Sequence, residues 1–313
     1  MSERKVPELS LLSYVNGSTN DQVHFVDTLF SGLKDYGFVV LTDHTVDQSK
    51  VDKAYEYVHE FFQLPIDTKL KYYSDKVAGQ RGLTPFGREH AKGNPNPDLK
   101  EFWHVGRELA ADSKYLGVYP DNMWPEEIPE FKEAFLQLYR AMDATSVVLL
   151  EAIGKSLDLP SGFFKEMVAD GNSILRTIHY PPTTGQDTKN SIRAAAHEDI
   201  NLITLLVGAT ASGLQLQDSD GSWLDVSSKP GQIVVDTGDM MSRLTNEVLP
   251  ATTHRVVNPD NSGDRRYSMP YFVHPHSEAM LSCLPSCEGE GRKYDDISAG
   301  AFLQQRLREI GLA

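Results

Sequence analysis

Apolar residues recur at every third or fourth position in several segments of the chain, which is the spacing of an amphipathic helix. The longest of these segments extends from about Glu130 to Leu157, and Pro160 lies beyond its end. Gly37 and Pro65 end two earlier segments, because glycine and proline interrupt a helix. The pattern predicts helices over about residues 21–36, 51–62, 67–74, 130–157, 163–168 and 298–310.

After Gly171 the pattern changes to short runs rich in β-branched and aromatic residues, separated by turn residues. These runs have no predicted helix between them, which favours a sandwich, barrel or jelly roll and excludes a doubly wound parallel sheet. A stretch rich in glycine, proline and isolated polar residues, from Lys76 to about Asn96, predicts a long irregular loop. The predicted strands are FVVLTD after Gly37, then SILRTIHY, LITLLV, LQLQ, WLDV, QIVVD, THRVV and RRYSMPYFV.

No repeat, low-complexity tract or linker divides the chain, so we expect one compact unit in which helices brace a β-core. The 313 residues, 40% of them apolar, are enough to bury a large core without disulfides or a structural metal. We expect an N-terminal region over residues 5–120, bracing helices over 121–170, the β-core over 171–276 and a C-terminal helical tail over 277–313.

The charge of the chain argues against polyanionic partners. It has 30 Lys and Arg against 44 Asp and Glu, a formal charge of −14, and no cluster of basic residues, so we expect neither nucleic acid nor a membrane as a partner. The longest nearly apolar run, residues 202–209, is too short to span a bilayer, and the amino terminus does not read as a secretory signal. The two cysteines, Cys283 and Cys287, form neither a disulfide framework nor a complete zinc site, which favours a cytoplasmic protein.

A His-x-Asp pair, His197 and Asp199, offers two metal ligands. Because side chains alternate along a strand, these two residues face the same side and Glu198 faces away. A third ligand, His254, follows in THRVV, and two imidazoles with one carboxylate are the set that a non-haem ferrous site requires. Such a pair is common by chance, so the pair alone fits a surface histidine and aspartate as well. A similar pair at His276 has no later histidine to complete a triad.

Arg266 and Ser268 form a second alternating pair, which puts a guanidinium and a hydroxyl on one face of a strand. An arginine fork beside a serine can hold a carboxylate in one orientation next to a metal. Tyr180, at the end of SILRTIHYPP, could donate a hydrogen bond to the same acid. Taken one at a time, the arginine could equally pair with an acidic residue and the tyrosine could cap the end of a barrel.

Five segments then occur in the order of a known family: LRTIHYPP, AAAHEDINLITLL, SGLQLQDSDGSWLDV, GQIVVDTGDMMSRLTNEVLPATTHRVV and RRYSMPYF. Together with an N-terminal region that contains GFVVLTDH and FFQLPIDTKLKYY, the chain resembles the isopenicillin N synthase-like branch of the Fe(II)- and 2-oxoglutarate-dependent oxygenases. The resemblance implies a mainly β protein with bracing helices. Its core would be a double-stranded β-helix (jelly roll), preceded by an N-terminal α/β region of the non-haem dioxygenase type and followed by a C-terminal helix.

The resemblance also implies roles for single residues. His197, Asp199 and His254 would be the iron ligands, Arg266 and Ser268 would hold the distal carboxylate of 2-oxoglutarate, and Tyr180 would belong to the family's Asn-x-Tyr-Pro element. Ile178 stands where that element has asparagine, so one polar contact to the cosubstrate is missing. The cofactors implied are Fe(II), 2-oxoglutarate and O2.

The implied function is the hydroxylation, desaturation or cyclisation of a small molecule, with decarboxylation of 2-oxoglutarate to succinate and CO2. Alternatives are an ethylene-forming type of enzyme, a 2-oxoglutarate-independent iron oxidase and a non-catalytic jelly roll that binds a metal or an oxoacid. The oligomeric state stays open. The candidates for contact with substrate are Phe86, Arg88, His90, Trp103, His104 and Phe272, each of which ordinary packing or solvation would also explain. An acidic substrate would follow if Arg88 faced the pocket.

Overall fold

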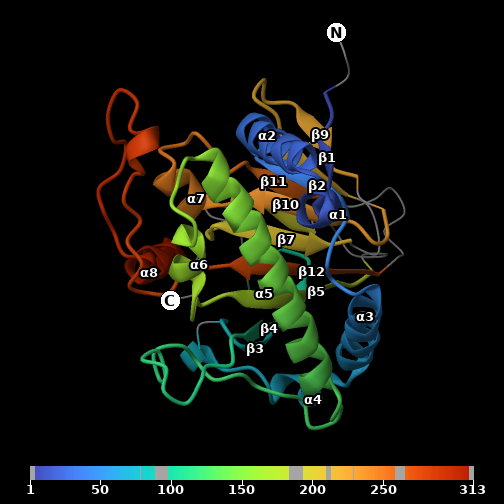
Figure 1. Cartoon of the computed structure of the whole chain (residues 1–313). Coiled ribbons are helices and arrows are strands. Elements are labelled where there is room, and N and C mark those ends of the chain that lie inside the picture. Colours follow the sequence, from blue (N-terminus) through green and yellow to red (C-terminus); the bar gives the residue numbers. More distant parts are fainter. Residues whose placement is uncertain are drawn as a thin grey trace.

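The structure is a computed structural model that describes residues 4–77, 79–88, 98–182, 193–208, 213–227, 229–257 and 265–309. Two β-sheets form its centre and helices cover one side (Figure 1). The eight-stranded sheet has the order β1 (Glu8–Ser10), β2 (Phe38–Asp43), β10 (Ile233–Thr237), β7 (Ile203–Val207), β12 (Arg266–Val273), β5 (Ile174–Tyr180), β4 (Glu101–Gly106) and β3 (Gly82–Thr84). The four-stranded sheet has the order β6 (Ala194–His197), β11 (His254–Val256), β8 (Leu214–Gln217) and β9 (Trp223–Asp225).

The helices are amphipathic and bury their apolar faces against the eight-stranded sheet and against one another. The longest, α5, crosses in front of the sheet (Figure 1) and packs against α2, α3, α6, β7 and β12. The helices are α1 (Leu11–Asn16), α2 (Thr19–Tyr36), α3 (Gln48–Gln63), α4 (Ile66–Leu70), α5 (Phe131–Ser156), α6 (Phe163–Val168), α7 (Asp239–Leu244) and α8 (Ala299–Glu309), with 3₁₀ turns at Asp75–Val77 and Pro285–Cys287.

The other face of the large sheet looks toward the small sheet. An apolar cluster that includes Phe38, Leu216 and Val256 fills one part of the space between the sheets, and a cavity occupies another part. This arrangement confirms the predicted fold class, a jelly-roll core with bracing helices, an N-terminal α/β region and a C-terminal helix. The capping box of Ser18 and Asp21 starts α2. Gly37 in the left-handed conformation ends this helix, as the pattern predicted.

Several details of the pattern-based prediction are wrong, and the prediction did not include β1 and α1. A helix, α7, interrupts the strands that were expected to follow one another without one. Four of its six residues are buried, so its apolar positions do not follow the spacing of one helix face. Strand β3 lies inside the segment predicted as irregular loop. Strand β4 was not predicted at all: every residue from Glu101 to Gly106 is buried, so its sequence does not alternate between apolar and polar. Within the described residues, no helix is long and apolar enough to cross a membrane.

Candidate metal centre

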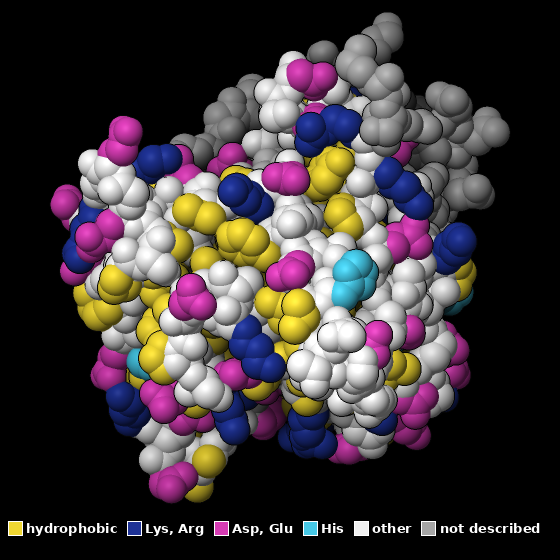
Figure 2. Space-filling view, turned by 45° about the horizontal axis from the view of Figure 1, so that its top comes forward, with side chains coloured by type: hydrophobic (Ala, Val, Ile, Leu, Met, Phe, Trp, Pro, Cys, Tyr) yellow, Lys and Arg dark blue, Asp and Glu magenta, His cyan; other side chains and the backbone are white. Residues whose placement is uncertain are grey.

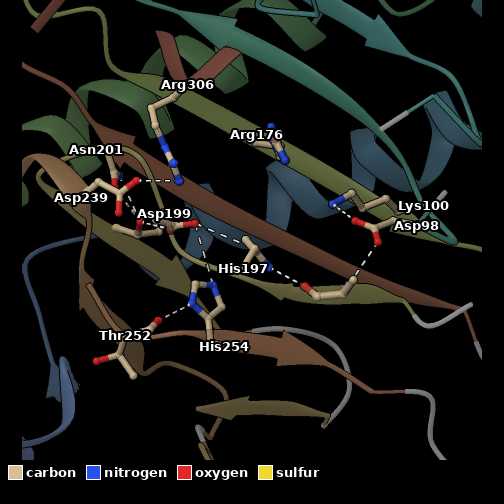
Figure 3. A network of polar contacts seen from close by, with 12 residues as sticks. Asp98, Lys100, Arg176, His197, Asp199, Asn201, Asp239, Thr252, His254 and Arg306 are labelled. Carbon is tan, nitrogen blue, oxygen red and sulfur yellow. Dashed lines mark hydrogen bonds and ion pairs between the residues drawn. The ribbon is translucent and has the colours of Figure 1, made fainter. Parts of the chain in front are cut away.

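His197, Asp199 and His254 converge at one end of the space between the sheets (Figure 3). His197 ends β6 and lies opposite His254, the first residue of the neighbouring strand β11. Asp199 follows two residues later, at the start of the connection to β7. Its Oδ1 lies 3.9 Å from Nε2 of each histidine, and one ligand atom from each of the three residues lies within 4.8 Å of the others. Two imidazoles and a carboxylate at these separations could hold one metal ion.

Backbone carbonyl groups orient both imidazoles. Nδ1 of His197 lies 2.7 Å from the carbonyl oxygen of Ala195, and Nδ1 of His254 lies 3.1 Å from that of Thr252. If each Nδ1 carries the proton and donates it to the carbonyl, each Nε2 is left with a lone pair directed at the shared centre. The imidazoles are thereby held in the tautomer and orientation that metal binding requires.

Asp199 is held from its other side. Its Oδ2 accepts a hydrogen bond from Oγ1 of Thr204, and Asn201 Nδ2 donates to that hydroxyl over 3.0 Å. The backbone N–H of Asp239 donates to the carbonyl oxygen of Asp199 over 2.7 Å. Gly238 permits this close approach, because a Cβ at that position would lie 2.8 Å from the Asp199 carbonyl oxygen. Helix α7 therefore serves to fix the turn that carries Asp199.

The electrostatics of the three residues suit a cation. Burial, and then repulsion from His254, lower the pKa of His197, although 34% of its side chain remains exposed. Burial opposes the charge of Asp199, but the two histidines and Thr204 outweigh it and lower the pKa of this carboxyl. Burial and the charge of Asp199 raise the pKa of Asp236 well above its ordinary value. Near neutral pH the centre therefore offers a neutral imidazole at His197 and a charged carboxylate at Asp199.

Arg266, Ser268 and Tyr180 meet on the facing wall, where Arg266 pairs with Tyr180 across β12 and β5. Nη1 of Arg266 lies 3.3 Å from Oγ of Ser268, and its Cζ lies 4.9 Å from the centre of the Tyr180 ring. The three side chains are almost completely buried and line the same cavity as the histidines and Asp199. The structure therefore brings together all six residues that the sequence proposed for iron and 2-oxoglutarate.

The cavity has a volume of about 340 Å³. Its walls come from both sheets and from α8, whose Leu303 and Leu307 face it. Arg306, on the same helix, forms an ion pair of 3.0 Å with Asp239, which ties the C-terminal helix to the turn beside Asp199 (Figure 3). The C-terminal helix is thus part of the site.

Some of the candidates for substrate contact line the cavity and others do not. Phe272 and His104 line the cavity. Trp103 does not: it is fully buried in the core, 4.7 Å from the ring of Phe61, so its assignment to the substrate is wrong. Side chains alternate along β4, and Trp103 points to the helical side of the sheet.

The two loop candidates that the structure describes do not reach the cavity. Phe86 is exposed, and Arg88 lies at the surface with an ion pair of 2.7 Å to Asp75. Charged side chains of both signs are spread over the face of the molecule shown in Figure 2. Neither Phe86 nor Arg88 lines the cavity, so the inference of an acidic substrate from Arg88 is not supported. His90 lies outside the described residues.

Sequence reasoning did not assign several polar residues to the cavity wall, among them Lys100, Arg176 and His274. For Arg176 a signal existed, because it precedes Tyr180 by four positions in the same strand and alternation places both on one face. No comparable signal identified Lys100, since β4 was not predicted. Burial lowers the pKa of His274 to about 4, so this cavity histidine is neutral.

Comparison with known proteins identifies the family. Residues 171–275 match the 2OG-Fe(II) oxygenase superfamily, and residues 6–127 match the family described as non-haem dioxygenase in morphine synthesis, N-terminal. The chain belongs to the 2OG-Fe(II) oxygenase superfamily. This oxygenase is therefore a non-haem iron enzyme whose cofactors are Fe(II), 2-oxoglutarate and O2, as the resemblance implied.

Among its relatives is the 2-oxoglutarate-Fe(II) type oxidoreductase hxnY of Emericella nidulans, 32% identical over 86% of this chain and 81% of that protein. A crystal structure of a 2OG-Fe(II) oxygenase family protein from Caulobacter crescentus is 44% identical, with a TM-score of 0.89 over 98% of this chain and 100% of that one. A full-length protein of Neurospora crassa, solved in complex with alpha-KG and thymine, is 27% identical, with a TM-score of 0.86 over 97% and 96% of the two chains.

Proposed function

We propose that His197, Asp199 and His254 of this oxygenase hold Fe(II), and that Arg266, Ser268 and Tyr180 hold the distal carboxylate of 2-oxoglutarate. One observation carries the proposal: the triad and the buried arginine line opposite walls of a single cavity. A cosubstrate that chelates the metal can therefore reach the arginine from there. Arginine suits this role because its planar fork pairs with a carboxylate through two hydrogen bonds.

The family cofactors supply the oxidising chemistry, in which 2-oxoglutarate and O2 react at the iron and succinate and CO2 are released. The protein contributes binding, orientation and exclusion of water. Ala195 and Thr252 hold the imidazoles through their carbonyl oxygens, and Thr204 holds the free oxygen of Asp199, so that Oδ1 faces the metal position. No side chain has to act as general base.

The cosubstrate contacts differ from the family pattern at Ile178, which lies between Arg176 and Tyr180 on the cavity face of β5. An isoleucine offers no hydrogen bond to the cosubstrate. Arg266, Ser268 and Tyr180 would therefore carry the polar contacts to 2-oxoglutarate on this wall.

We further propose that the prime substrate is a small molecule that is hydroxylated, desaturated or cyclised in the remaining part of the cavity. The N-terminal region (5–120), the bracing helices (121–170), the jelly-roll core (171–276) and the tail (277–313) would act as one unit. Packing of α5 against β7 and β12 and of α8 against the site supports this. The free thiols of Cys283 and Cys287 suit a reducing, cytoplasmic location.

Succinate formation tests the proposal. Protein loaded with Fe(II) under argon and then given 2-oxoglutarate and air is expected to form succinate even without a prime substrate. Asp199→Ala should abolish this, because one ligand is lost from the metal position. Asp220→Ala, which removes an exposed carboxylate in the turn between β8 and β9, is the matched control and should keep the wild-type rate.

The alternatives predict different products. Ethylene in the headspace would indicate an ethylene-forming type of enzyme. Absence of 2-oxoglutarate binding to the iron-loaded protein, measured by calorimetry, would indicate an oxidase that does not use this cosubstrate. Binding of 2-oxoglutarate without succinate, ethylene or another oxidised product would indicate a binding protein and would contradict the proposal.

A further inference from the structure

His274 lies just beyond the far end of the strand that carries Arg266. Ser268, Pro270 and Phe272 follow Arg266 at alternate positions of β12 and line the cavity, and His274, directly after the strand, lines it too. His274 follows Arg266 by eight positions, which corresponds to about 26 Å of extended strand. It is therefore remote from the position proposed for the distal carboxylate of 2-oxoglutarate.

The backbone around His274 is anchored next to the metal centre. Its own N–H donates to Oγ of Ser173 over 3.1 Å. The carbonyl oxygen of the preceding Val273 accepts a hydrogen bond of 3.0 Å from the N–H of Leu202, in the segment that leads from Asp199 to β7. These contacts place His274 close to the turn that carries Asp199.

The imidazole of His274 is oriented in the same way as those of the proposed metal ligands. Its Nδ1 lies 3.2 Å from the carbonyl oxygen of Phe272, two residues earlier. His197 and His254 each contact the carbonyl oxygen two residues before them as well. Because a carbonyl oxygen only accepts, this contact favours the proton on Nδ1 and leaves the lone pair of a neutral imidazole on Nε2.

The Nε2 atom of His274 is an acceptor without a partner. His274 is only 6% exposed, and within the described residues its Nε2 makes no hydrogen bond. This atom is not among the completely enclosed ones, so it can be reached from the cavity. Both ring nitrogens of another cavity histidine, His104, have partners, namely the carbonyl oxygen of Gly79 and Nε of Arg176.

Two further observations leave this acceptor to a ligand. His274 does not belong to the group of described residues whose ligand atoms converge on the metal position. Burial lowers the pKa of its imidazole to about 4, so near pH 7 the ring is neutral and Nε2 accepts. A buried acceptor that stays unpaired costs free energy, which a donor on a bound ligand would recover.

The cavity wall defines the rest of the ligand. Phe272 pairs with Ile174 across β12 and β5, and both side chains line the cavity. Helix α8 contributes Leu303 and Leu307 to the same cavity. A ligand that donates to His274 would therefore place an apolar body against these side chains.

We propose that Nε2 of His274 accepts a hydrogen bond from the prime substrate, so that this oxygenase acts on an alcohol, a phenol or an N–H amide with an apolar body. The inference rests on the proposed function, because it assigns the metal position and Arg266 to iron and 2-oxoglutarate. His274 is then a specificity-determining residue: a substrate whose donor is methylated leaves the buried acceptor unpaired.

Matched pairs of probes with and without a donor test the inference. Phenol is compared with anisole, cyclohexanol with cyclohexyl methyl ether, and 2-pyridone with 1-methyl-2-pyridone. Binding is measured by calorimetry under argon on protein loaded with Fe(II) and saturated with 2-oxoglutarate. In at least one pair we expect the donor to bind about fivefold or more tightly than its methylated counterpart, the factor expected when a buried acceptor loses its partner.

Four variants locate the preference. His274→Phe and His274→Leu both lack Nε2, so each should abolish the difference within that pair, and binding of the methylated probe shows which variant is folded. His274→Gln carries an amide oxygen that can accept and should keep part of the preference. His276→Phe changes a histidine that contacts Tyr115 over 2.8 Å outside the cavity, and it should keep the full preference.

Two results would overturn the inference: wild-type protein that binds no donor more tightly than its methylated counterpart, or a folded variant without Nε2 that keeps the preference. Failure of the proposed function would look different, because wild-type protein would then form no succinate from 2-oxoglutarate in air without any probe. Succinate formation together with an absent donor preference would therefore refute the role of His274 alone.

Discussion

Substitution of Thr204 by valine tests whether the hydroxyl that donates a hydrogen bond to Asp199 increases the metal affinity of the site. Threonine and valine have nearly the same shape, so Thr204→Val removes a hydroxyl and leaves the packing of this fully buried position almost unchanged. The hydroxyl donates to Oδ2 of Asp199 and accepts a hydrogen bond of 3.0 Å from Asn201. Asn201 keeps a second acceptor, the carbonyl oxygen of Ile203 at 2.9 Å, so the main loss falls on Asp199.

The expected magnitude follows from that lost hydrogen bond. A hydrogen bond to a charged group contributes about 1.5–3 kcal/mol, and partners of metal ligands change metal affinity by about 10- to 100-fold. The valine also removes one of the interactions that lower the pKa of Asp199. We therefore expect Thr204→Val to bind the metal about 10- to 100-fold more weakly, with the larger loss at lower pH.

Titration with Mn(II), followed by the electron paramagnetic resonance signal of the free ion, measures this affinity without turnover. Thr253→Val is the matched control, because its hydroxyl donates over 3.0 Å to the exposed Glu198 rather than to Asp199. It removes the same group one residue from His254 and should bind Mn(II) like the wild type. Equal affinities of Thr204→Val and wild-type protein would refute the role assigned to Thr204.

Three further predictions concern the cosubstrate, pH and the core. Arg266→Gln should raise the KM for 2-oxoglutarate about tenfold or more. Arg266→Lys should raise this KM less, because lysine keeps the charge but lacks the planar guanidinium that pairs with a carboxylate through two hydrogen bonds. An unchanged KM in initial-rate measurements of succinate formation would contradict the assignment of Arg266 to the distal carboxylate. Burial depresses the pKa of His274 from 6.5 to about 4, so its contribution to stability is present above about pH 6.5 and is lost as pH falls toward 4. The free energy of unfolding is measured with urea at about pH 7 and about pH 4.5. Between these two pH values it should fall by about 2 kcal/mol less for His274→Asn than for wild-type protein. Equal decreases in the two proteins would exclude this histidine as the cause. Trp103→Ala should lower the free energy of unfolding by about 3–5 kcal/mol, because the indole is fully buried among aromatic rings; a change below about 1 kcal/mol would show that the ring is not part of the core.

Much of the site could be predicted because its chemistry is contained in short segments. The His-x-Asp pair, the histidine of THRVV and the Arg-x-Ser pair each depend on alternation along one strand, which is a local property of the backbone. The long helices could be predicted for the same reason, since one apolar face repeats over many residues. In α7, by contrast, four of the six residues are buried, so no single apolar face could be recognised from the sequence.

Strand pairing decided what the local pattern left open. Trp103 and His104 are neighbours in sequence, yet only His104 reaches the cavity, because the pairing of β4 with β5 turns the indole toward the helices. The register also places His104 opposite Arg176, so that the two side chains meet. The sequence of β4 predicts neither the direction of Trp103 nor the contact between His104 and Arg176. Both faces of this strand are covered, so apolar and polar residues do not alternate along it.

Local sequence therefore specified which residue types are available for iron and 2-oxoglutarate. The tertiary structure decided which arginine lies at the cavity: Arg88 follows a turn and pairs with Asp75 at the surface, whereas Arg176 lies on the wall of the cavity. The physical reason is that the direction of a loop side chain depends on contacts with distant segments. The direction of a strand side chain follows from alternation once the face of the sheet is known.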